Sequence, residues 1–293
     1  MFENVLVGVD GSPSGRDALA LALALREPSG RLTLAHVHAG QLHPLHAVTP
    51  GLLKEEREAS ERLLREERER AHTQAELVSI IGASPAAALH RQAEEQEADL
   101  IVVGSCSRGS FGRAMLGDDA RQALNGASCA IAIASRGYAQ APQPIARVGV
   151  AYNDTAESRA ALECARGLAA ATRARLSALE VISIPTYAYT GLVAPIGEGL
   201  NAMLEEANER MRRLADVDGR AVYGLTGEEL AVFGDELDIL VVGSRGYGPL
   251  RRLVIGSTSD FLERHARCSL LVLPRAAAAH ERAQTQEAAP PAA

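Results

Sequence analysis

The sequence has no tryptophan, and aromatic residues make up only 3% of its 293 positions. A hydrophobic core must therefore be built from Leu, Val, Ile and Ala, which is typical of helices packed on a parallel sheet. Long apolar runs are missing too, since the longest, ALALALAL at 18–25, has eight residues. A membrane-spanning helix needs about 20 apolar residues. The sequence therefore predicts no membrane partner.

Basic residues are in the minority, with 30 Lys and Arg against 37 Asp and Glu and a formal net charge of −7. This balance excludes broad nucleic-acid binding, which needs a basic surface, but not a small anion held by backbone N–H groups. Cysteine is scarce, and Cys106, Cys129, Cys164 and Cys268 lie far apart without metal-binding spacing. The N-terminus lacks the basic region of a signal peptide. We expect a cytoplasmic protein without disulfides or a bound metal.

The sequence does contain one pattern twice. ADLIVVGS (98–105) resembles LDILVVGS (237–244), and SCAIAIASR (128–136) resembles RCSLLVLPR (267–275). Three pairs of anchor residues share a separation of 139 positions, namely Gly104 and Gly243, Gly117 and Gly256, and Cys129 and Cys268. A common separation predicts two copies of one domain.

The copies are predicted at 1–138 and 145–275. The sequence between them, RGYAQAPQPIA, has the Ala, Gln and Pro content of a short linker. Residues 276–293 show no periodic apolar pattern, which predicts a disordered tail.

Strands alternate with helices in each copy, with the second strand predicted at RLTLAHVHA (31–39) and a long connection at 186–200. This order predicts right-handed crossovers and two tandem, open, five-stranded parallel-sheet α/β domains with helices on both faces, a Rossmann-like architecture. Ligands of such sheets bind beyond the carboxyl ends of the strands, where strand order reverses. The first strand ends at Asp10 and the fourth at Gly104, so the glycine-rich loop starts at that edge.

The second copy carries the motif Gly243-x2-Gly246-x9-Gly256-Ser257 directly after a strand. Gly243 lets a ligand approach the backbone, and Gly246 permits a turn with positive φ. The helix predicted after Gly256 offers free N–H groups and a partial positive charge to a phosphate, to which Ser257 and Thr258 can add hydroxyls. The alternative is purely structural, with glycines that form turns and a serine that caps a helix.

These segments, together with VLVGVDGSPSGRDAL at the start, resemble the universal stress protein family in its tandem two-domain form. The G-x2-G-x9-G-[S/T] motif of the ATP-binding members is matched fully in the second copy. The resemblance implies the adenine nucleotide alpha hydrolase-like fold with ATP, and with it Mg²⁺, at the sheet edge. It also implies a regulatory role in stress response, dormancy or growth control rather than a strong catalytic activity.

Carried over by position, the acid that ends the first strand contacts the nucleoside, and the backbone of a second-strand valine meets adenine. The nucleotide-binding residues expected in the second copy are Asn153, Asp154, Val181, Val242, Gly243, Arg245, Gly246, Gly256, Ser257 and Thr258. Those expected in the first copy, where the motif is degenerate, are Asp10, Val37, Gly104, Ser107 and Gly117. No catalytic residue is assigned.

The first copy departs from the motif, because Ser107 replaces the middle glycine and Asp118 stands where the second copy has Ser257. A carboxylate about 4 Å from a phosphate charge costs roughly 4 kcal/mol at an effective dielectric constant of 20. The attraction between a phosphate and a helix N-terminus offsets only about 0.3–1 kcal/mol of this repulsion. We expect the second copy to bind ATP firmly and the first weakly or not at all.

Two other functions remain open at this point. One is a slow ATP hydrolase or ATP-consuming transferase, for which Asp154 is the best candidate base. The other is an interaction module that needs no nucleotide. The exposed edges of two similar sheets predict a pseudo-symmetric pair of copies and a homodimer of chains, with a protein partner that stays unknown.

Overall fold

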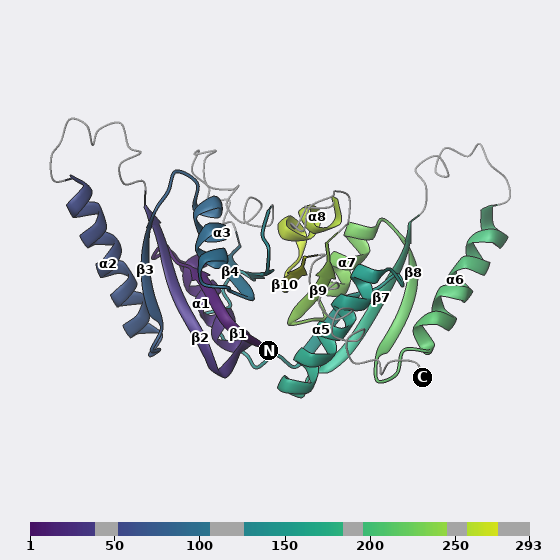
Figure 1. The fold of residues 1–293 in the computed structure, drawn as a ribbon. Helices are drawn as coiled ribbons and strands as arrows, with labels where there is room; N and C mark the ends of the chain where they lie inside the picture. The colour runs from purple at the N-terminus through teal and green to yellow at the C-terminus, as the bar shows by residue number, and fades with distance from the viewer. Residues whose placement is uncertain (39–51, 106–125, 184–195, 245–256, 275–293) are drawn as a thin grey trace, which may run out of the picture.

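The computed structural model describes residues 1–38, 52–105, 126–183, 196–244 and 257–274 (Figure 1). The first half contains β1 (Phe2–Gly8), α1 (Pro13–Leu25), β2 (Arg26–His38), α2 (Leu52–Arg70), β3 (Glu76–Ile81), α3 (Pro85–Glu95), β4 (Leu100–Gly104) and β5 (Ala130–Ala134). The second half contains β6 (Arg147–Ala151), α5 (Ala156–Thr172), β7 (Arg175–Ser183), α6 (Ile196–Arg212), β8 (Asp218–Gly224), α7 (Thr226–Gly234), β9 (Ile239–Gly243), α8 (Ser257–His265) and β10 (Ser269–Leu273).

The strands of the described residues form one sheet in the order β3-β2-β1-β4-β5-β10-β9-β6-β7-β8. Within each half the five strands are neighbours and pair in parallel. The tandem α/β architecture expected from the sequence is therefore confirmed. The sequence did not predict that both halves share one continuous sheet.

The two halves meet where β5 and β10 pair antiparallel, with Leu271 opposite Ala132. These two residues are 139 positions apart, so they are equivalent in the two copies. An approximate two-fold axis therefore passes between them. Figure 1 shows the result, with β10 and α8 near the middle of the molecule and α2 and α6 on its outer flanks.

Helices cover both faces of the sheet. The core on one face takes residues from α1, α2, α5 and α6, and the core on the other takes residues from α3, α7 and α8. The Leu-Ala alternation of 18–25 forms a helix, whose Leu21 and Leu25 are fully buried. Burial of each such leucine contributes about 1.5–3 kcal/mol. No helix in the described part of the chain is long and apolar enough to cross a membrane.

Two elements begin earlier than the sequence predicts. Strand β2 starts at Arg26, because Gly30 lets the segment lie against β1, where a Cβ would meet the Glu3 carbonyl oxygen at 2.9 Å. Helix α6 starts at Ile196, inside the expected connection. The glycines at the start of α6 are typical of a loop. The helix is nevertheless held in place further along, because Met211 is fully buried in the core.

None of the three described cysteines, Cys129, Cys164 and Cys268, is in a disulfide bond. Burial raises the pKa of Cys129 and of Cys268 to about 12. Both thiols therefore stay protonated at neutral pH and are unreactive.

Candidate functional site

A hollow of about 450 Å³ lies at the carboxyl ends of β6, β7 and β9. The chain runs outward from β6 to β7 and β8 and then returns to β9, which neighbours β6. Strand order therefore reverses at the hollow, where open α/β sheets bind ligands. Its size lies within the range of about 300–1,000 Å³ of small-molecule sites.

Half of the residues predicted for the second copy meet in this hollow. The predicted residues that line it are Asn153, Val181, Val242, Gly243 and Thr258. Asp154 and Ser257 are exposed and are not part of the lining. Outside the described residues lie Arg245, Gly246 and Gly256.

Gly243 ends β9 under the first turn of α5. A Cβ at this position would lie 2.7 Å from the carbonyl oxygen of Glu157 and 3.0 Å from its Cβ. A side chain there would force the helix away from the strand. Glycine thus sets how closely α5 packs on the strand end beside the hollow, while its approach to a ligand stays a prediction.

The start of α5 is held by reciprocal caps. Thr155 Oγ1 accepts from the Ser158 backbone N–H at 3.3 Å, and Ser158 Oγ accepts from the Thr155 backbone N–H at 3.0 Å. Asn153 Oδ1 accepts from Thr155 Oγ1 at 2.9 Å and holds the turn into the helix. The first-turn N–H groups of Ala156 and Glu157 have no acceptor within the helix. The helix therefore presents partial positive charge beside the hollow.

Two buried serines also line the hollow. Ser244 follows β9 and is 2% exposed, and Ser259 lies in the first turn of α8 and is 5% exposed. Neither hydroxyl oxygen is among the fully buried polar atoms that lack a hydrogen-bond partner, so the two are not orphaned in the core. They belong to residues that line a space large enough for a ligand. They are the strongest sign in the structure that the hollow is a binding site.

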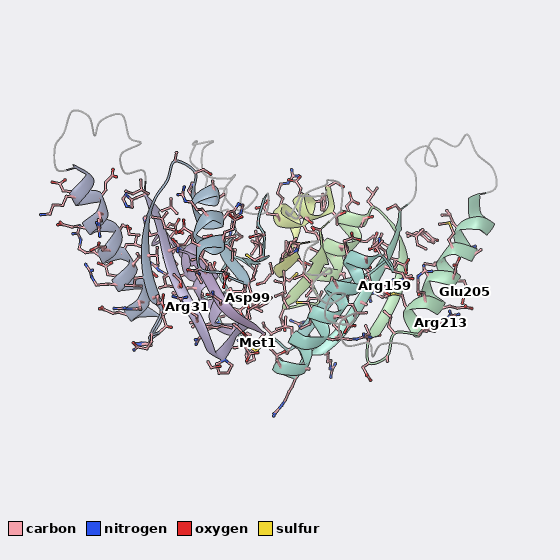
Figure 2. The ribbon with its side chains drawn as sticks, viewed as in Figure 1. Met1, Arg31, Asp99, Arg159, Glu205 and Arg213 are labelled. Atoms are coloured by element: carbon pink, nitrogen blue, oxygen red, sulfur yellow. The ribbon has the colours of Figure 1, made fainter. Side chains whose placement is uncertain are left out.

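Asp154 is engaged outside the hollow. Its φ is +58°, and the equivalent residue of the first copy is Gly11, with φ +75°. The carboxylate accepts at 2.9 Å from Tyr152 Oη and at 2.9 Å from Nε of Arg159, which Figure 2 labels on α5. These hydrogen bonds, that of Arg159 above all, lower the pKa of Asp154. A carboxylate of low pKa is a weak base, so the structure does not favour Asp154 as a catalytic base.

The edge of the first copy is packed more closely. Ser14 Oγ donates to the Ser105 carbonyl at 2.6 Å and joins the start of α1 to the end of β4. A Cβ on Gly104 would lie only 2.1 Å from the Ser14 carbonyl oxygen. Asp10 Oδ1 accepts from the backbone N–H of Ser12 at 3.0 Å and from its hydroxyl at 2.6 Å. One oxygen of the Asp10 carboxylate is thus already used in the turn.

The structure describes one of the other three residues predicted for the first copy. Val37 is partly buried against the core of the face that carries α3. Ser107 and Gly117 lie outside the described residues.

Comparison with known proteins identifies the family. The model of the universal stress protein family matches residues 1–135 and 144–274. This chain belongs to the universal stress protein family. A universal stress protein of Mycobacterium tuberculosis strain H37Rv is 26% identical to it over 280 residues, which cover 94% of this chain and 97% of that protein.

Solved universal stress proteins share the fold. The crystal structure of one from Archaeoglobus fulgidus matches with a TM-score of 0.62 at 18% identity and covers 93% of this chain and 98% of that one. Another, solved in complex with cAMP, matches 42% of this chain and 87% of its own at 26% identity and a TM-score of 0.30. At least one universal stress protein therefore binds a nucleotide.

Eleven of the 16 described lining residues of this universal stress protein were not predicted from the sequence, among them Glu157, Ser183, Thr226, Ser244 and Ser259. Ser183 Oγ and Thr226 Oγ1 lie 2.8 Å apart and bridge the end of β7 to the start of α7. Ser244 could have been predicted from its position directly after Gly243, but the motif specifies the glycines and not the residue between them. The other four become neighbours only through the folding of separate helices and strands.

Among the described residues, no group of three or more His, Cys, Asp or Glu is placed to hold a metal ion. Burial, and then the neighbouring His38, lower the pKa of His36. His36 is therefore neutral at physiological pH.

Proposed function

We propose that the second copy binds ATP, with Mg²⁺, in the hollow between β6 and β9, and that the protein is a cytoplasmic ATP-binding regulator of stress response, dormancy or growth without strong catalytic activity. The observation that carries the proposal is the pair of hydroxyls on Ser244 and Ser259, two largely buried residues that line the hollow. They lie where strand order reverses, beside the starts of two helices.

The lining divides by chemistry in a way that suits a nucleotide. Leu179, Val181, Leu230 and Val242 provide an apolar surface for a flat base. The hydroxyls of Thr258 and of the two buried serines, together with the helix starts, provide donors for phosphate oxygens. In this proposal the backbone of Val181 meets adenine and Asn153 contacts the ribose. Arg245, Gly246, Gly256 and Ser257 complete the phosphate loop.

The closer packing of Ser14 on β4 supports weaker binding by the first copy. The carboxylate of Asp118, expected near the phosphates, would also weaken nucleotide binding by the first copy, because it repels the phosphate charge. We propose that the first copy serves mainly as the structural partner of the second.

Calorimetric titration of the full chain with ATP, ADP, AMP and cAMP in the presence of Mg²⁺ tests this function. Replacing both Ser244 and Ser259 with Ala removes two ligand donors without breaking a hydrogen bond among the described residues. We expect ATP affinity to fall by about tenfold or more, since each hydrogen bond contributes about 1 kcal/mol. Ser105→Ala changes the equivalent serine of the first copy and should leave affinity unchanged. Absence of nucleotide binding, or full affinity in the double variant, would overturn the proposal.

The expected homodimer is also a proposal. Strands β3 and β8 end the sheet, and each pairs on one side only among the described residues. Ile81 and Tyr223 occupy equivalent positions at their ends and are 47% and 45% exposed. Sedimentation of the wild type and of Ile81→Lys and Tyr223→Lys variants tests whether these edges join two chains. A monomeric wild type would rule the dimer out.

A further inference from the structure

A second hollow, of about 560 Å³, lies between helix α2 and strand β3 in the first copy. Figure 1 shows these two elements side by side on the left flank, where β3 ends the sheet. The hollow shares no described residue with the one proposed to bind a nucleotide, and α2 covers the opposite face of the sheet from α7 and α8. Its volume lies within the range of small-molecule sites. It is therefore a candidate site for a different ligand.

Leu77 of β3 accounts for the space between the helix and the strand. The equivalent residue of the second copy is Gly219, because Leu77 pairs with Leu34 and Gly219 with Ala178 at the same place in the sheet. A Cβ on Gly219 would lie 3.1 Å from the Cβ of Met211, so α6 packs directly on β8. A leucine side chain at this position does not allow such a close approach. The first copy therefore keeps α2 further from β3.

The walls of this hollow differ in chemistry. Leu77 and Ile81 of β3, together with Leu64 of α2, form an apolar wall, and Ile81 is 47% exposed. Arg57 and Arg65 line the helix side. They lie about 12 Å apart along the helix, and the two β3 residues lie about 13 Å apart along the strand. An elongated apolar wall beside cations suits a ligand with an apolar chain and an anionic headgroup.

Of the two arginines, Arg65 has the more available guanidinium. Glu61 is the one carboxylate among the described lining residues, and it accepts from Arg57 Nε at 3.0 Å. Arg65 Nη1 is 3.9 Å from the other oxygen of Glu61, which is too far for a hydrogen bond. Residues 39–51, which join β2 to α2, contain no Asp or Glu. A guanidinium in this state can bind a carboxylate through two parallel hydrogen bonds.

The register between α2 and β3 places Arg65 next to the apolar wall. Ser79 Oγ donates to Ser60 Oγ at 2.7 Å, and α2 runs toward the start of β3. The next turn of the helix, which contains Arg65, therefore lies beside Leu77. We propose that this hollow binds a carboxylate that carries an apolar chain, the chemistry of a fatty acid, with its headgroup on Arg65 and its chain along Leu77 and Ile81. This inference does not depend on nucleotide binding by the second copy.

Calorimetric titration of the full chain with decanoate and with decanol, which has the same chain but no charge, tests the proposal. We expect decanoate to bind at a single site and at least about fivefold more tightly than decanol. Arg65→Gln should weaken decanoate binding at least about fivefold and leave decanol binding unchanged. Glu61→Gln should strengthen decanoate binding by about twofold or more, because a like charge is removed. Arg62→Gln removes an exposed charge of α2 outside the hollow and should match the wild type.

Nuclear magnetic resonance of methyl-labelled protein locates the bound chain. Decanoate should shift the methyl signals of Leu64, Leu77 and Ile81 and leave that of Val242, in the nucleotide hollow, unchanged. No saturable binding of decanoate, undiminished binding in Arg65→Gln, or shifts confined to other parts of the chain would overturn the proposal. Equal weakening of decanoate and decanol in Arg65→Gln would show that the arginine shapes the hollow, which would overturn its assignment to the headgroup.

Discussion

At the scale of single residues, both copies anchor their first strand in the same way. Asp238 precedes β9 and accepts from the backbone N–H groups of Ala146 and Arg147 at 2.9 and 2.8 Å. The equivalent residue Asp99, labelled in Figure 2, accepts from two backbone N–H groups at the start of β1. Each aspartate therefore fixes a central strand at the end of the sheet opposite to the hollow.

Asp238 gives the protein a dependence on pH. Burial acts to raise its pKa, but hydrogen bonds from the Arg147 side chain and two backbone N–H groups outweigh burial, so the net pKa is lowered. Its stabilisation is present above the unfolded pKa of about 3.9 and is lost as pH falls through the lower folded value. We expect Asp238→Asn to cost about 1–3 kcal/mol at pH 7. Urea unfolding should show a shallower loss of stability below pH ~4 in the variant, and superimposable pH profiles would contradict this assignment.

Asp154 provides a second test at this scale. Its carboxylate is held by Tyr152 and Arg159 outside the hollow, and its pKa is lowered. Asp154→Ala should therefore change neither ATP affinity nor any slow hydrolysis by more than about twofold, since no ligand contact is lost. Calorimetry and phosphate release measure the two quantities. Loss of turnover in this variant would instead favour the hydrolase.

Sequence patterns predicted the part of the site that is encoded locally. The motif after the strand led to Val242, Gly243 and Thr258, all of which line the hollow. Glu157 and Ser259 could not be found in this way, because each lies on a helix whose inward face depends on tertiary packing. Asp154 was assigned to the nucleotide, but its positive φ and its bond to Arg159 direct it to the surface of α5.

At the scale of elements, the position of α8 depends on its contact with α7. Gly227 lies in the first turn of α7, and a Cβ there would meet the Phe261 ring of α8 at 2.8 Å. No side chain fits without moving one of the two helices. The packing of this glycine therefore holds Thr258 and Ser259 at the hollow.

Gly227→Ala should displace α8 and cost about 1–3 kcal/mol, the range for overpacking. ATP affinity should fall with it if the start of α8 binds phosphate. Chemical unfolding and calorimetry measure the two effects. Gly167→Ala is the matched control, because Gly167 is exposed in α5 with open space around its Cβ position, and it should stabilise the protein by about 0.5–1 kcal/mol. Equal stability of both variants would refute the contact.

The elements themselves were largely predictable, because apolar runs and their repetition identify strands and helices locally. Their boundaries were less so where glycine has a packing role, as Gly30 has in β2. The antiparallel pairing of β5 with β10 joins residues more than a hundred positions apart. The sequence predicted a symmetric pair of copies, but strand pairing at such separation is set by tertiary structure and is not written in local pattern.

At the scale of the whole molecule, the linker is fixed by a buried carboxylate. Asp17 of α1 is 3% exposed and accepts from the backbone N–H groups of Gly137 and Ala139, each at 2.8 Å. Ala160 is the equivalent residue of the second copy. Asp17 therefore attaches the first copy to the segment that leads into the second.

Asp17→Asn leaves one acceptor oxygen for two partly buried donors, and Asp17→Ala introduces the residue of the second copy. We expect losses of about 1–3 kcal/mol for each variant, because these N–H groups lose their partner. Cleavage by trypsin after Arg136 should also become faster. Wild-type cleavage rates and unfolding midpoints in both variants would show that the carboxylate does not hold the linker.

The antiparallel contact of Ala132 with Leu271 has an evolutionary consequence. In a symmetric dimer of identical chains, every substitution changes both sites at once. Here the two halves are encoded separately, so one half can accumulate substitutions as long as it still packs against the other. The copies differ at Ser107 and Gly246 and at Asp118 and Ser257, which is the kind of difference that such freedom permits. Because the two halves belong to one chain but have separate sequences, they can take on different roles.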